Sequence, residues 1–435
     1  MNKYVEKWVE SSLILKILIG LIIGAILGLA VPQYEMIGLL GQLFVSALKA
    51  IAPLLVFVLV ASALAKAGEG IRSRFRTVIV LYIFSTFLSA MVAVTGSFLF
   101  PVSMHLTQAG EVTAPGGLGE VISNMLLNIF TNPLQSLSQG DYLGILFWAI
   151  VFGICLKQVG SPTTKNVFED CANATSLIVK GIIQFAPIGI MSLVFSAVAE
   201  SGLSIFIQYG QLIVLLVACI ATVALITDPL IAAFALRRNP YPLVFTCLKE
   251  SGITAFFTRS SAANIPVNMR LCERLGLDKD FYSISIPLGA TINMEGAAIT
   301  ITIMTLAVCH TLGIAVDLPT TIVLCIISTL AAAGSSGVAG GSLLLIPMAC
   351  SLFGIPADIS MQAIAVGFII GVIQDSCETA LNSSGDALFS ATAEYHDRAK
   401  AGEPVNFLGE FAKDKEEATA YSSSLFNFFS IFSYF

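Results

Sequence analysis

The part of the chain between Lys279 and Arg398 contains no lysine or arginine, although a long apolar run within it leads into several polar residues. These polar residues recur at spacings of three, four, seven and eleven, which places them on one side of an α-helix. They are Asp375, Glu378, Thr379, Asn382 and Asp386. A charge at the centre of a bilayer costs about 2.5–3.5 kcal/mol. This polar stripe therefore predicts an unusual partner: a distant arginine, a metal ion, protons or a cationic substrate group.

Composition indicates the class of protein. Of the 435 residues, 56% are apolar and 11% are charged, whereas soluble domains carry about 25% charged residues. We therefore predict a polytopic membrane protein in a lipid bilayer. The formal net charge of −6 indicates no nucleic-acid partner. The nine cysteines and three histidines are scattered singly, which argues against a disulfide framework, a zinc site and a membrane enzyme.

Apolar runs long enough to cross a bilayer occur six times in the first half of the chain. They cover residues 13–31, 37–66, 76–103, 142–157, 176–198 and 205–236. The segment 121–137, interrupted by Pro133, is interpreted as an extra part of the fourth span. The first run lacks a signal-peptide cleavage site and is interpreted as a retained helix. Loop lysines and arginines lie before the first span and after the second, fourth and sixth, so the positive-inside rule predicts a cytoplasmic N-terminus and an outer loop at 105–120.

Two later segments, 241–269 and 320–353, are apolar but interrupted by polar or glycine-rich tips at 258–264 and 334–342. Basic residues flank the first segment at both ends, which predicts a re-entrant hairpin from the cytoplasmic side, and the second enters from the outer side. A full span follows each hairpin, at 281–311 and at the polar stripe. Paired interrupted segments in inverted halves point to a transporter's binding site, so we expect both tips to meet the polar helices. Two kinked helices, or a channel with an acidic ring, are the alternatives.

Several motifs resemble those of the dicarboxylate/amino acid:cation symporters, which have the glutamate-transporter fold. The motifs are the first tip Arg259-Ser260-Ser261, the sequence Asn293-Met294-Glu295-Gly296, the glycine-rich second tip and the polar stripe. The likeness is strongest over residues 256–386 and is greatest to the bacterial serine/threonine:sodium symporters. It implies a homotrimer in the bacterial inner membrane, with both termini cytoplasmic and a peripheral domain that carries substrate across.

The predicted fold is thus all-α, with eight transmembrane helices and two re-entrant helical hairpins in inverted repeats. Residues 1–240 hold six transmembrane helices, part of them scaffold and trimer contacts. Residues 241–394 form the core of the transport domain, with hairpin 1, helix 7, hairpin 2 and helix 8. Residues 395–435 form a cytoplasmic tail, whose aromatic end at 425–435 is assigned no function.

The resemblance also implies substrate-binding residues. Asp375 matches the carboxylate that binds the substrate amino group, and Asn382 matches the amide that binds the substrate carboxylate. Other substrate-contacting positions are Ser260, Ser261, Val338, Glu378 and Thr379. Because Asp375 and Asn382 lie two helical turns apart, they suit the two ends of a zwitterion. The structural alternative is that Asp375 is a buried acid paired with Arg259.

The same resemblance implies that Na⁺ is the coupling ion and that no other cofactor is needed. One sodium site comprises the Gly289 carbonyl, Asn293, Asn382 and Asp386. A second comprises Thr291, Met294 and backbone near Ser335. A third comprises Tyr82, Ser85, Thr86, Asn293 and an acid at position 295. At that position the family has aspartate, whereas this chain has Glu295, whose side chain is one methylene longer.

Glu378 bears on the choice of substrate. In acidic-substrate members of the family an arginine stands three residues after the binding aspartate, where it pairs with the substrate's side-chain carboxylate. Here that residue is Glu378, which repels a carboxylate and accepts a hydrogen bond from a hydroxyl. We predict a secondary active transporter that imports small neutral amino acids, serine or threonine, by symport with sodium. The alternatives are a proton- or sodium-coupled symporter of acidic amino acids or dicarboxylates, and a Glu378 that turns toward Arg259.

Overall fold

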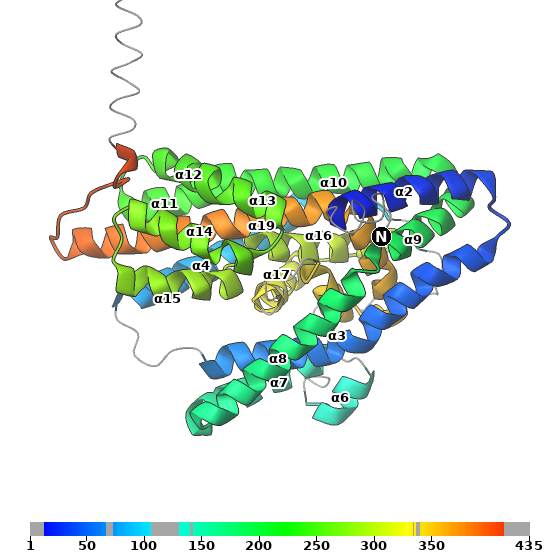
Figure 1. The fold of residues 1–435 in the computed structure, drawn as a ribbon, viewed down its shortest axis with the longest axis horizontal. Coiled ribbons are helices and arrows are strands. Elements are labelled where there is room, and N and C mark those ends of the chain that lie inside the picture. The colour runs from blue at the N-terminus through cyan, green and yellow to red at the C-terminus, as the bar shows by residue number, and fades with distance from the viewer. Residues whose placement is uncertain are drawn as a thin grey trace, which may run out of the picture.

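The computed structural model describes residues 13–66, 73–104, 106, 130–139, 142–333, 335 and 340–412. Every regular element in these residues is a helix (Figure 1). Five helical runs in them are long and apolar enough to cross a membrane, or six if one bent pair of helices is a single span. The prediction of an all-α chain with several membrane-length helices is confirmed. The tip residue Val338, the aromatic end at 425–435 and most of the loop at 105–120 lie outside the described residues.

One group of helices packs together on one side of the molecule. Its members are α2 (Leu13–Ala30), η1 (Glu35–Ile37), α3 (Gly38–Lys66), α6 (Pro133–Gln139), α7 (Tyr142–Val159), α8 (Pro162–Ile183), α9 (Ala186–Ser201) and η2 (Gly202–Ser204). Helix α3 packs on α7 and α8 and forms with them the lower arm in Figure 1. Helix α2 runs along α9. The absence of a side chain at Gly24 permits this contact, because a Cβ there would lie 2.2 Å from the Met191 carbonyl oxygen.

A second group surrounds α19 (Ala357–Lys400), the longest helix among the described residues. Its members are α4 (Ser73–Leu99), α10 (Ile205–Thr222), η3 (Val223–Thr227), α11 (Asp228–Leu236), α12 (Tyr241–Cys247), η4 (Leu248–Gly252), α13 (Ile253–Thr258), α14 (Ser261–Arg274), α15 (Lys279–Ile292), α16 (Glu295–Thr311), α17 (Leu318–Ala332), η5 (Ser342–Leu345) and α18 (Ile346–Ser351). Helices α4, α10, α13, α14, α15 and α16 all contact α19. The polar stripe is therefore enclosed on several sides.

The predicted fifth span at 176–198 is not one continuous helix. The chain breaks between α8 and α9 with a bend of 54°. Tight turns close α8, since Gln184 N donates to Gly181 O and Phe185 N donates to Ile182 O. Pro187 at the start of α9 has no N–H to continue the preceding helix and restricts the residue before it. A hydrophobic run alone does not show such a break.

The predicted span at 281–311 is interrupted in its middle. Helix α15 ends at Ile292 and α16 begins at Glu295, and the two residues between them are not helical, with ψ of 75° at Asn293 and 55° at Met294. The break falls within the motif that the sequence singled out. It leaves peptide groups outside the helical hydrogen-bond ladder at the level of the polar stripe.

The first tip is shorter than the predicted interruption at 258–264. Only Arg259 and Ser260 separate α13 from α14. Arg259 adopts a left-handed conformation (φ 51°) that ends α13, and the Ser260 side chain accepts a hydrogen bond from Ala263 N, which starts α14. Because serine is a favourable N-cap, the residues from Ser261 onward form α14 and are not part of a non-helical tip.

The second interrupted segment consists of α17, then η5 and α18. Asp317 caps α17 by accepting a hydrogen bond from Thr320 N at 2.7 Å. Between the arms, only Ser335 and residues 340–342 belong to the described part of the tip. Gly340 has a φ of 72°, which favours glycine. The Gly340 N–H faces α19, where it donates to Asp375 Oδ1.

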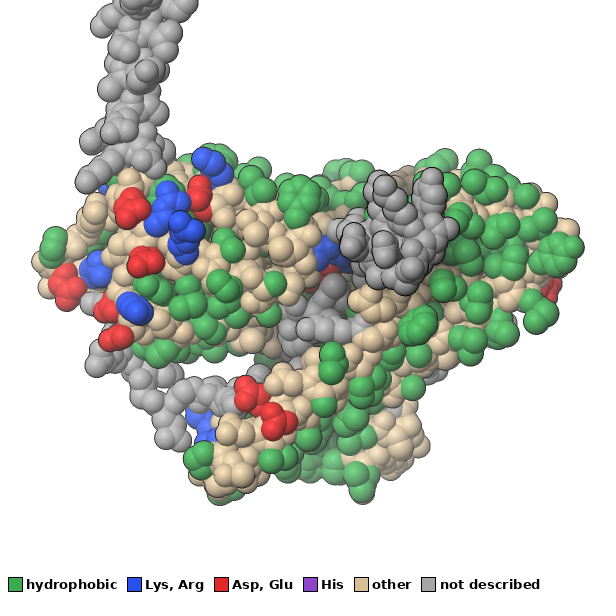
Figure 2. Space-filling view, in the orientation of Figure 1, with side chains coloured by type: hydrophobic (Ala, Val, Ile, Leu, Met, Phe, Trp, Pro, Cys, Tyr) green, Lys and Arg blue, Asp and Glu red, His purple; other side chains and the backbone are tan. Residues whose placement is uncertain are grey.

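Helix α19 is 44 residues long, or about 66 Å at 1.5 Å per residue, so it extends beyond a hydrocarbon core of about 30 Å. The predicted boundary at residues 394–395 falls inside it. Beyond its end, Leu408 and Phe411 belong to the same hydrophobic cluster as Leu271 of α14 and Leu275, the residue that follows α14. In Figure 2 most charged side chains gather at this end of the bundle, near α11, α12, α14 and α15, whereas hydrophobic side chains dominate elsewhere.

Candidate functional site

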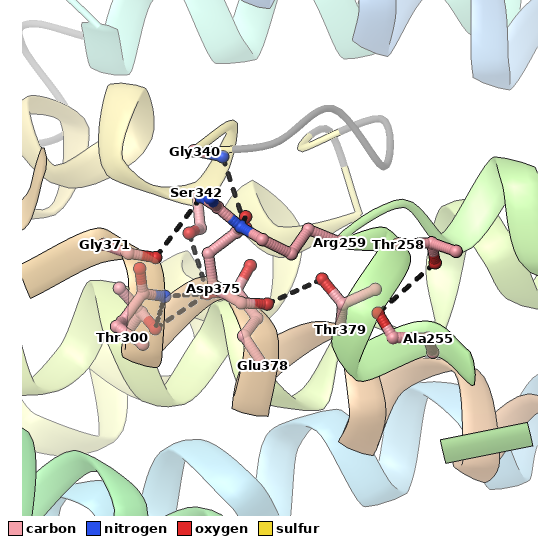
Figure 3. A network of polar contacts seen from close by, with 11 residues as sticks. Ala255, Thr258, Arg259, Thr300, Gly340, Ser342, Gly371, Asp375, Glu378 and Thr379 are labelled. Carbon is pink, nitrogen blue, oxygen red and sulfur yellow. Dashed lines mark hydrogen bonds and ion pairs between the residues drawn. The ribbon is translucent and has the colours of Figure 1, made fainter. Parts of the chain in front are cut away.

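Both tips contact a single carboxylate in the middle of α19 (Figure 3). Asp375 Oδ2 accepts a hydrogen bond from Arg259 Nε at 2.7 Å, and Asp375 Oδ1 accepts one from Gly340 N at 3.2 Å. Asp375 is 3% exposed. The structure therefore brings the two tips together at the first residue of the polar stripe, as the paired interruptions predicted. The structure also contains the ion pair between Asp375 and Arg259, which the sequence analysis gave as an alternative role for Asp375.

Arg259 is placed by the backbone of the first tip. Its left-handed conformation costs about 1–3 kcal/mol for a residue other than glycine. Two contacts oppose this cost, because the guanidinium forms the ion pair with Asp375 and its Nη2 donates to Gly371 O at 3.3 Å. The cavity lined by these residues has a volume of only about 20 Å³, room for about one water molecule. The space beside Asp375 in this structure is therefore too small for a ligand much larger than water.

Glu378 lies one helical turn further along α19, in a shell of neutral donors (Figure 3). Its Oε2 accepts hydrogen bonds from Thr300 Oγ1 at 2.8 Å, from Ser342 Oγ at 2.8 Å and from Gln374 Nε2. Within the described residues it forms no ion pair, and Arg259 is directed at Asp375 instead. The alternative in which Glu378 turns toward Arg259 is thus wrong for this structure. The carboxyl group is fixed, buried and without a compensating cation among the described side chains.

Sequence reasoning did not assign Gln374, Thr300 or Ser342 to this site. Gln374 stands four residues before Glu378, so helical spacing could have placed it on the same face. Thr300 lies in an otherwise apolar helix, where one hydroxyl gives no periodic signal. Ser342 was within the predicted second tip but had no assigned role.

Three residues of the first predicted sodium site converge at the break between α15 and α16. Asn293 Nδ2 donates to Asp386 Oδ1 at 3.1 Å and to Asn382 O at 3.3 Å. Asn382 Oδ1 accepts a hydrogen bond from Gly296 N at 2.7 Å, so α19 caps the start of α16. Gly289 closes the group, since a Cβ there would lie 2.8 Å from Asp386 Oδ1. Asp386 Oδ2 is buried without a hydrogen-bond partner in the described part of the chain.

Helix α4 forms the wall opposite this break. Tyr82, Ser85 and Thr86 are all 0% exposed. Tyr82 Oη donates to Asp386 O at 3.0 Å, and Ser85 Oγ donates to Asn293 Oδ1 at 3.3 Å. The Thr86 hydroxyl donates to Tyr82 O within the same helix. The residues of the third predicted site therefore meet those of the first.

The second predicted site is less assembled. Thr291 Oγ1 donates to Leu288 O at 2.7 Å, and Met294 Sδ lies 3.4 Å from Asn382 Nδ2. Ser335 N donates to Ala332 O, and no hydrogen bond joins Ser335 to Thr291 or Met294 in the described ranges. Of the remaining predicted substrate contacts, Ser261 is 3% exposed at the start of α14. Thr379 Oγ1 donates to Asp375 O at 2.7 Å.

The pairing of the buried charged side chains indicates which kind of ligand the site can hold. Arg259 pairs with Asp375, and Arg398 pairs with Glu394. The buried carboxylates that remain without an ion pair among the described side chains are Asp228, Glu295, Glu378 and Asp386. Burying a carboxylate without a counter-charge is costly. The oxygen-rich group at the helix break therefore fits a small cation that arrives from solution, and exposed peptide carbonyls at broken helices suit Na⁺.

Broken helices and two chain tips that converge on buried carboxylates define a helical membrane transporter. The family model described as Sodium:dicarboxylate symporter family matches residues 13–395. The chain belongs to this family, which confirms the resemblance and a transporter rather than an enzyme. It is therefore a multi-pass membrane protein.

Curated relatives are similar over most of their length. The chain is 56% identical over 396 residues to the serine/threonine transporter SstT of Streptococcus agalactiae serotype III (strain NEM316), covering 91% of this chain and 98% of the relative. It is 58% identical over 393 residues to the serine/threonine transporter SstT of Bifidobacterium adolescentis, covering 90% and 91%. It is 54% identical over 396 residues to the protein of that name from Streptococcus thermophilus (strain LMG 18311), covering 91% and 98%.

Proposed function

We propose that this protein is a secondary active transporter that imports small neutral amino acids, serine and threonine, by symport with sodium. The observation that carries the substrate choice is Glu378, which lies one turn from Asp375, buried, hydrogen-bonded to three neutral groups and unpaired by any described cation. A fixed carboxylate repels a substrate side-chain carboxylate in a partly dry site. The names of the relatives support the same choice.

The proposed binding mode uses the polar stripe for the two ends of the zwitterion. Asp375 accepts the substrate ammonium after Arg259 has withdrawn, and Asn382 with the backbone of both tips receives the substrate carboxylate. The serine or threonine hydroxyl bonds to the carboxyl group of Glu378. Alanine lacks that hydroxyl and leaves the buried Glu378 with one bond fewer, so it should bind more weakly.

Sodium is the proposed co-substrate. The three proposed sites are those implied by the family resemblance, and the unpartnered Asp386 Oδ2 supports the first of them. No group of three or more His, Cys, Asp or Glu suited to a metal occurs among the described residues. Amide, hydroxyl and peptide oxygens would therefore complete each site, which suits an ion that has to bind and leave.

The proposed architecture has eight transmembrane helices and two re-entrant hairpins. In it, residues 241–394 form the core of a transport domain, part of residues 1–240 supplies scaffold and trimer contacts, and residues 395–435 lie in the cytoplasm. The gathering of lysines and arginines at the end of the bundle near α11, α14 and α15 (Figure 2) supports a cytoplasmic position for that end. We propose a homotrimer in the bacterial inner membrane.

Uptake into proteoliposomes tests this function. Vesicles with the purified protein receive labelled serine under an inward Na⁺ gradient, or under a pH gradient with choline replacing Na⁺. We expect uptake only with the Na⁺ gradient, with competition by unlabelled threonine and none by aspartate or glutamate. Equal uptake with choline would contradict sodium coupling, and strong labelled aspartate uptake would contradict the substrate assignment.

A further inference from the structure

Two buried carboxyl groups from different helices face one another on the α4 side of the helix break. Glu295 is the first residue of α16 and is 0% exposed, and Asp228 is the first residue of α11 and is 2% exposed. Their carboxyl groups lie close enough to interact electrostatically with each other. Sequence reasoning did not single out Asp228, because one acid near the end of an apolar run has no spacing signal.

Three of the four carboxyl oxygens of this pair lack a hydrogen-bond partner among the described residues. Both carboxylate oxygens of Glu295 and Oδ1 of Asp228 are buried without a hydrogen-bond donor in the described part of the chain. No described lysine or arginine forms an ion pair with either residue. Ionised carboxylates only accept hydrogen bonds, and like charges repel strongly in a dry site. The unpartnered, buried oxygens of Glu295 and Asp228 therefore point to a positively charged ligand.

The surroundings suit a small ion rather than an organic cation. Gly385 of α19 presents only backbone to the pair, since a Cβ there would lie 2.9 Å from Glu295 Oε2 and 2.8 Å from Asn293 Nδ2. The Ser85 hydroxyl of α4 donates to Asn293 Oδ1 at 3.3 Å, two residues before Glu295. Asp228 directly follows the π-helical segment η3, and such segments frequently occur at functional sites.

We propose that Asp228 and Glu295 together hold one of the transported sodium ions, so that α11 supplies a sodium ligand that the family motifs do not assign. This inference rests on the proposed sodium symport. A second carboxylate strengthens the attraction of the site for a monovalent cation. The ion would join α11 to the start of α16 and reduce the repulsion between the two acids.

Thermal unfolding of the purified full chain tests the proposal without transport. The unfolding midpoint is measured against NaCl concentration, with choline chloride holding ionic strength constant. In Asp228→Asn we expect the half-maximal NaCl concentration to rise by about tenfold, the effect of losing about 1.4 kcal/mol of binding free energy. Without sodium, Asp228→Asn should unfold at a higher temperature than the unmodified chain, because it removes a like charge and its Nδ2 can donate to Glu295.

Asp317→Asn is the matched control, because it makes the same chemical change at an exposed helix cap where asparagine is equally favourable. Asp317→Asn should change neither the unfolding midpoint nor the dependence of that midpoint on NaCl concentration. Equilibrium binding of labelled sodium at a subsaturating concentration is the second readout, and Asp228→Asn and Asp228→Ser should both bind less. Because serine is smaller and keeps one oxygen, it tests the ligand role even if asparagine perturbs folding.

If the half-maximal NaCl concentration of Asp228→Asn lies within twofold of that of the unmodified chain, the proposal is overturned. A lower unfolding temperature of sodium-free Asp228→Asn would also overturn it, since the pair would then be a stabilising internal hydrogen bond. An unmodified chain that responds alike to NaCl and choline chloride would contradict both this inference and the proposed sodium symport. A normal response of the unmodified chain with an unchanged response of Asp228→Asn would contradict this inference alone.

Discussion

Arg259 Nε lies 2.7 Å from Asp375 Oδ2, and the two side chains are only 12% and 4% exposed. This ion pair joins the first tip to the centre of α19. The Arg259 guanidinium stands where the proposed mechanism requires the substrate ammonium, so the two cations compete for the Asp375 carboxylate. Arg259 thus neutralises Asp375 in this structure, and in the proposed mechanism substrate binding has to release it.

Replacement of Arg259 should reveal this competition. Arg259→Ala removes one partner of a buried pair, which typically costs about 3–5 kcal/mol of stability. We expect a lower unfolding temperature without substrate and a larger increase on addition of serine with NaCl than in the unmodified chain. Thermal unfolding measures both quantities. Arg270→Ala, a change at an exposed residue of the neighbouring α14, is the control. If serine with NaCl raises the unfolding temperature of Arg259→Ala and of this control by the same amount, the competition is contradicted.

Asp375→Asn should abolish serine uptake while the protein still inserts and folds. The amide oxygen can still accept a hydrogen bond from the substrate ammonium but lacks the negative charge that attracts it, and hydrogen bonds to charged groups are worth about 1.5–3 kcal/mol. Proteoliposome uptake measures transport, and size-exclusion chromatography in detergent checks assembly. Uptake at the unmodified rate would mean that Asp375 has only a structural role with Arg259.

Glu378→Arg should change the substrate preference. The guanidinium removes the repulsion against a substrate side-chain carboxylate and supplies a partner for it. We expect serine uptake to fall at least about tenfold and unlabelled aspartate to become a competitor. Glu378→Gln, which keeps the shape and removes the charge, should lower serine uptake less. Competition assays in proteoliposomes compare the two variants, and unchanged serine selectivity in Glu378→Arg would exclude Glu378 from the substrate site.

Gly296→Ala should disturb the contact between α16 and α19. A Cβ at this position would lie 2.7 Å from Glu378 Cα and 2.9 Å from Glu378 O, so the helices must separate. Overpacking of this kind costs about 1–3 kcal/mol, and it shifts the Gly296 N–Asn382 Oδ1 hydrogen bond. We expect lower thermal stability and reduced uptake. Gly181→Ala in α8, where no atom lies within 4 Å of the new Cβ, should be neutral, and equal behaviour of the two variants would contradict the tight contact.

Helical spacing predicted which side of α19 is polar, because a period of 3.6 residues is fixed by the backbone. The paired interruptions likewise predicted that the two tips meet the polar helix, and Arg259 and Gly340 both reach Asp375. The partner of each charge could not be predicted. Arg259 could have paired with Asp375 or with Glu378. Which of the two it contacts depends on the left-handed backbone conformation that directs its side chain.

Isolated polar residues in apolar helices were the main omission. Thr300 and Asp228 have no periodic neighbours of their kind, so only the packing of α16 and of α11 against α19 shows their surroundings. The bend before Pro187 was also missed, because a hydrophobic run predicts membrane burial but not a straight helix. The functional roles of the site residues stay predictions that the variants above test.

Flux of labelled sodium driven by serine is the most direct test of the central claim, which is sodium-coupled amino-acid symport. Proteoliposomes with equal Na⁺ on both sides receive an inward serine gradient, and entry of ²²Na⁺ is followed. We predict that serine and threonine each accelerate ²²Na⁺ entry, that aspartate does not, and that Asp375→Asn removes the effect. Entry of ²²Na⁺ at the same rate with and without serine would contradict the account.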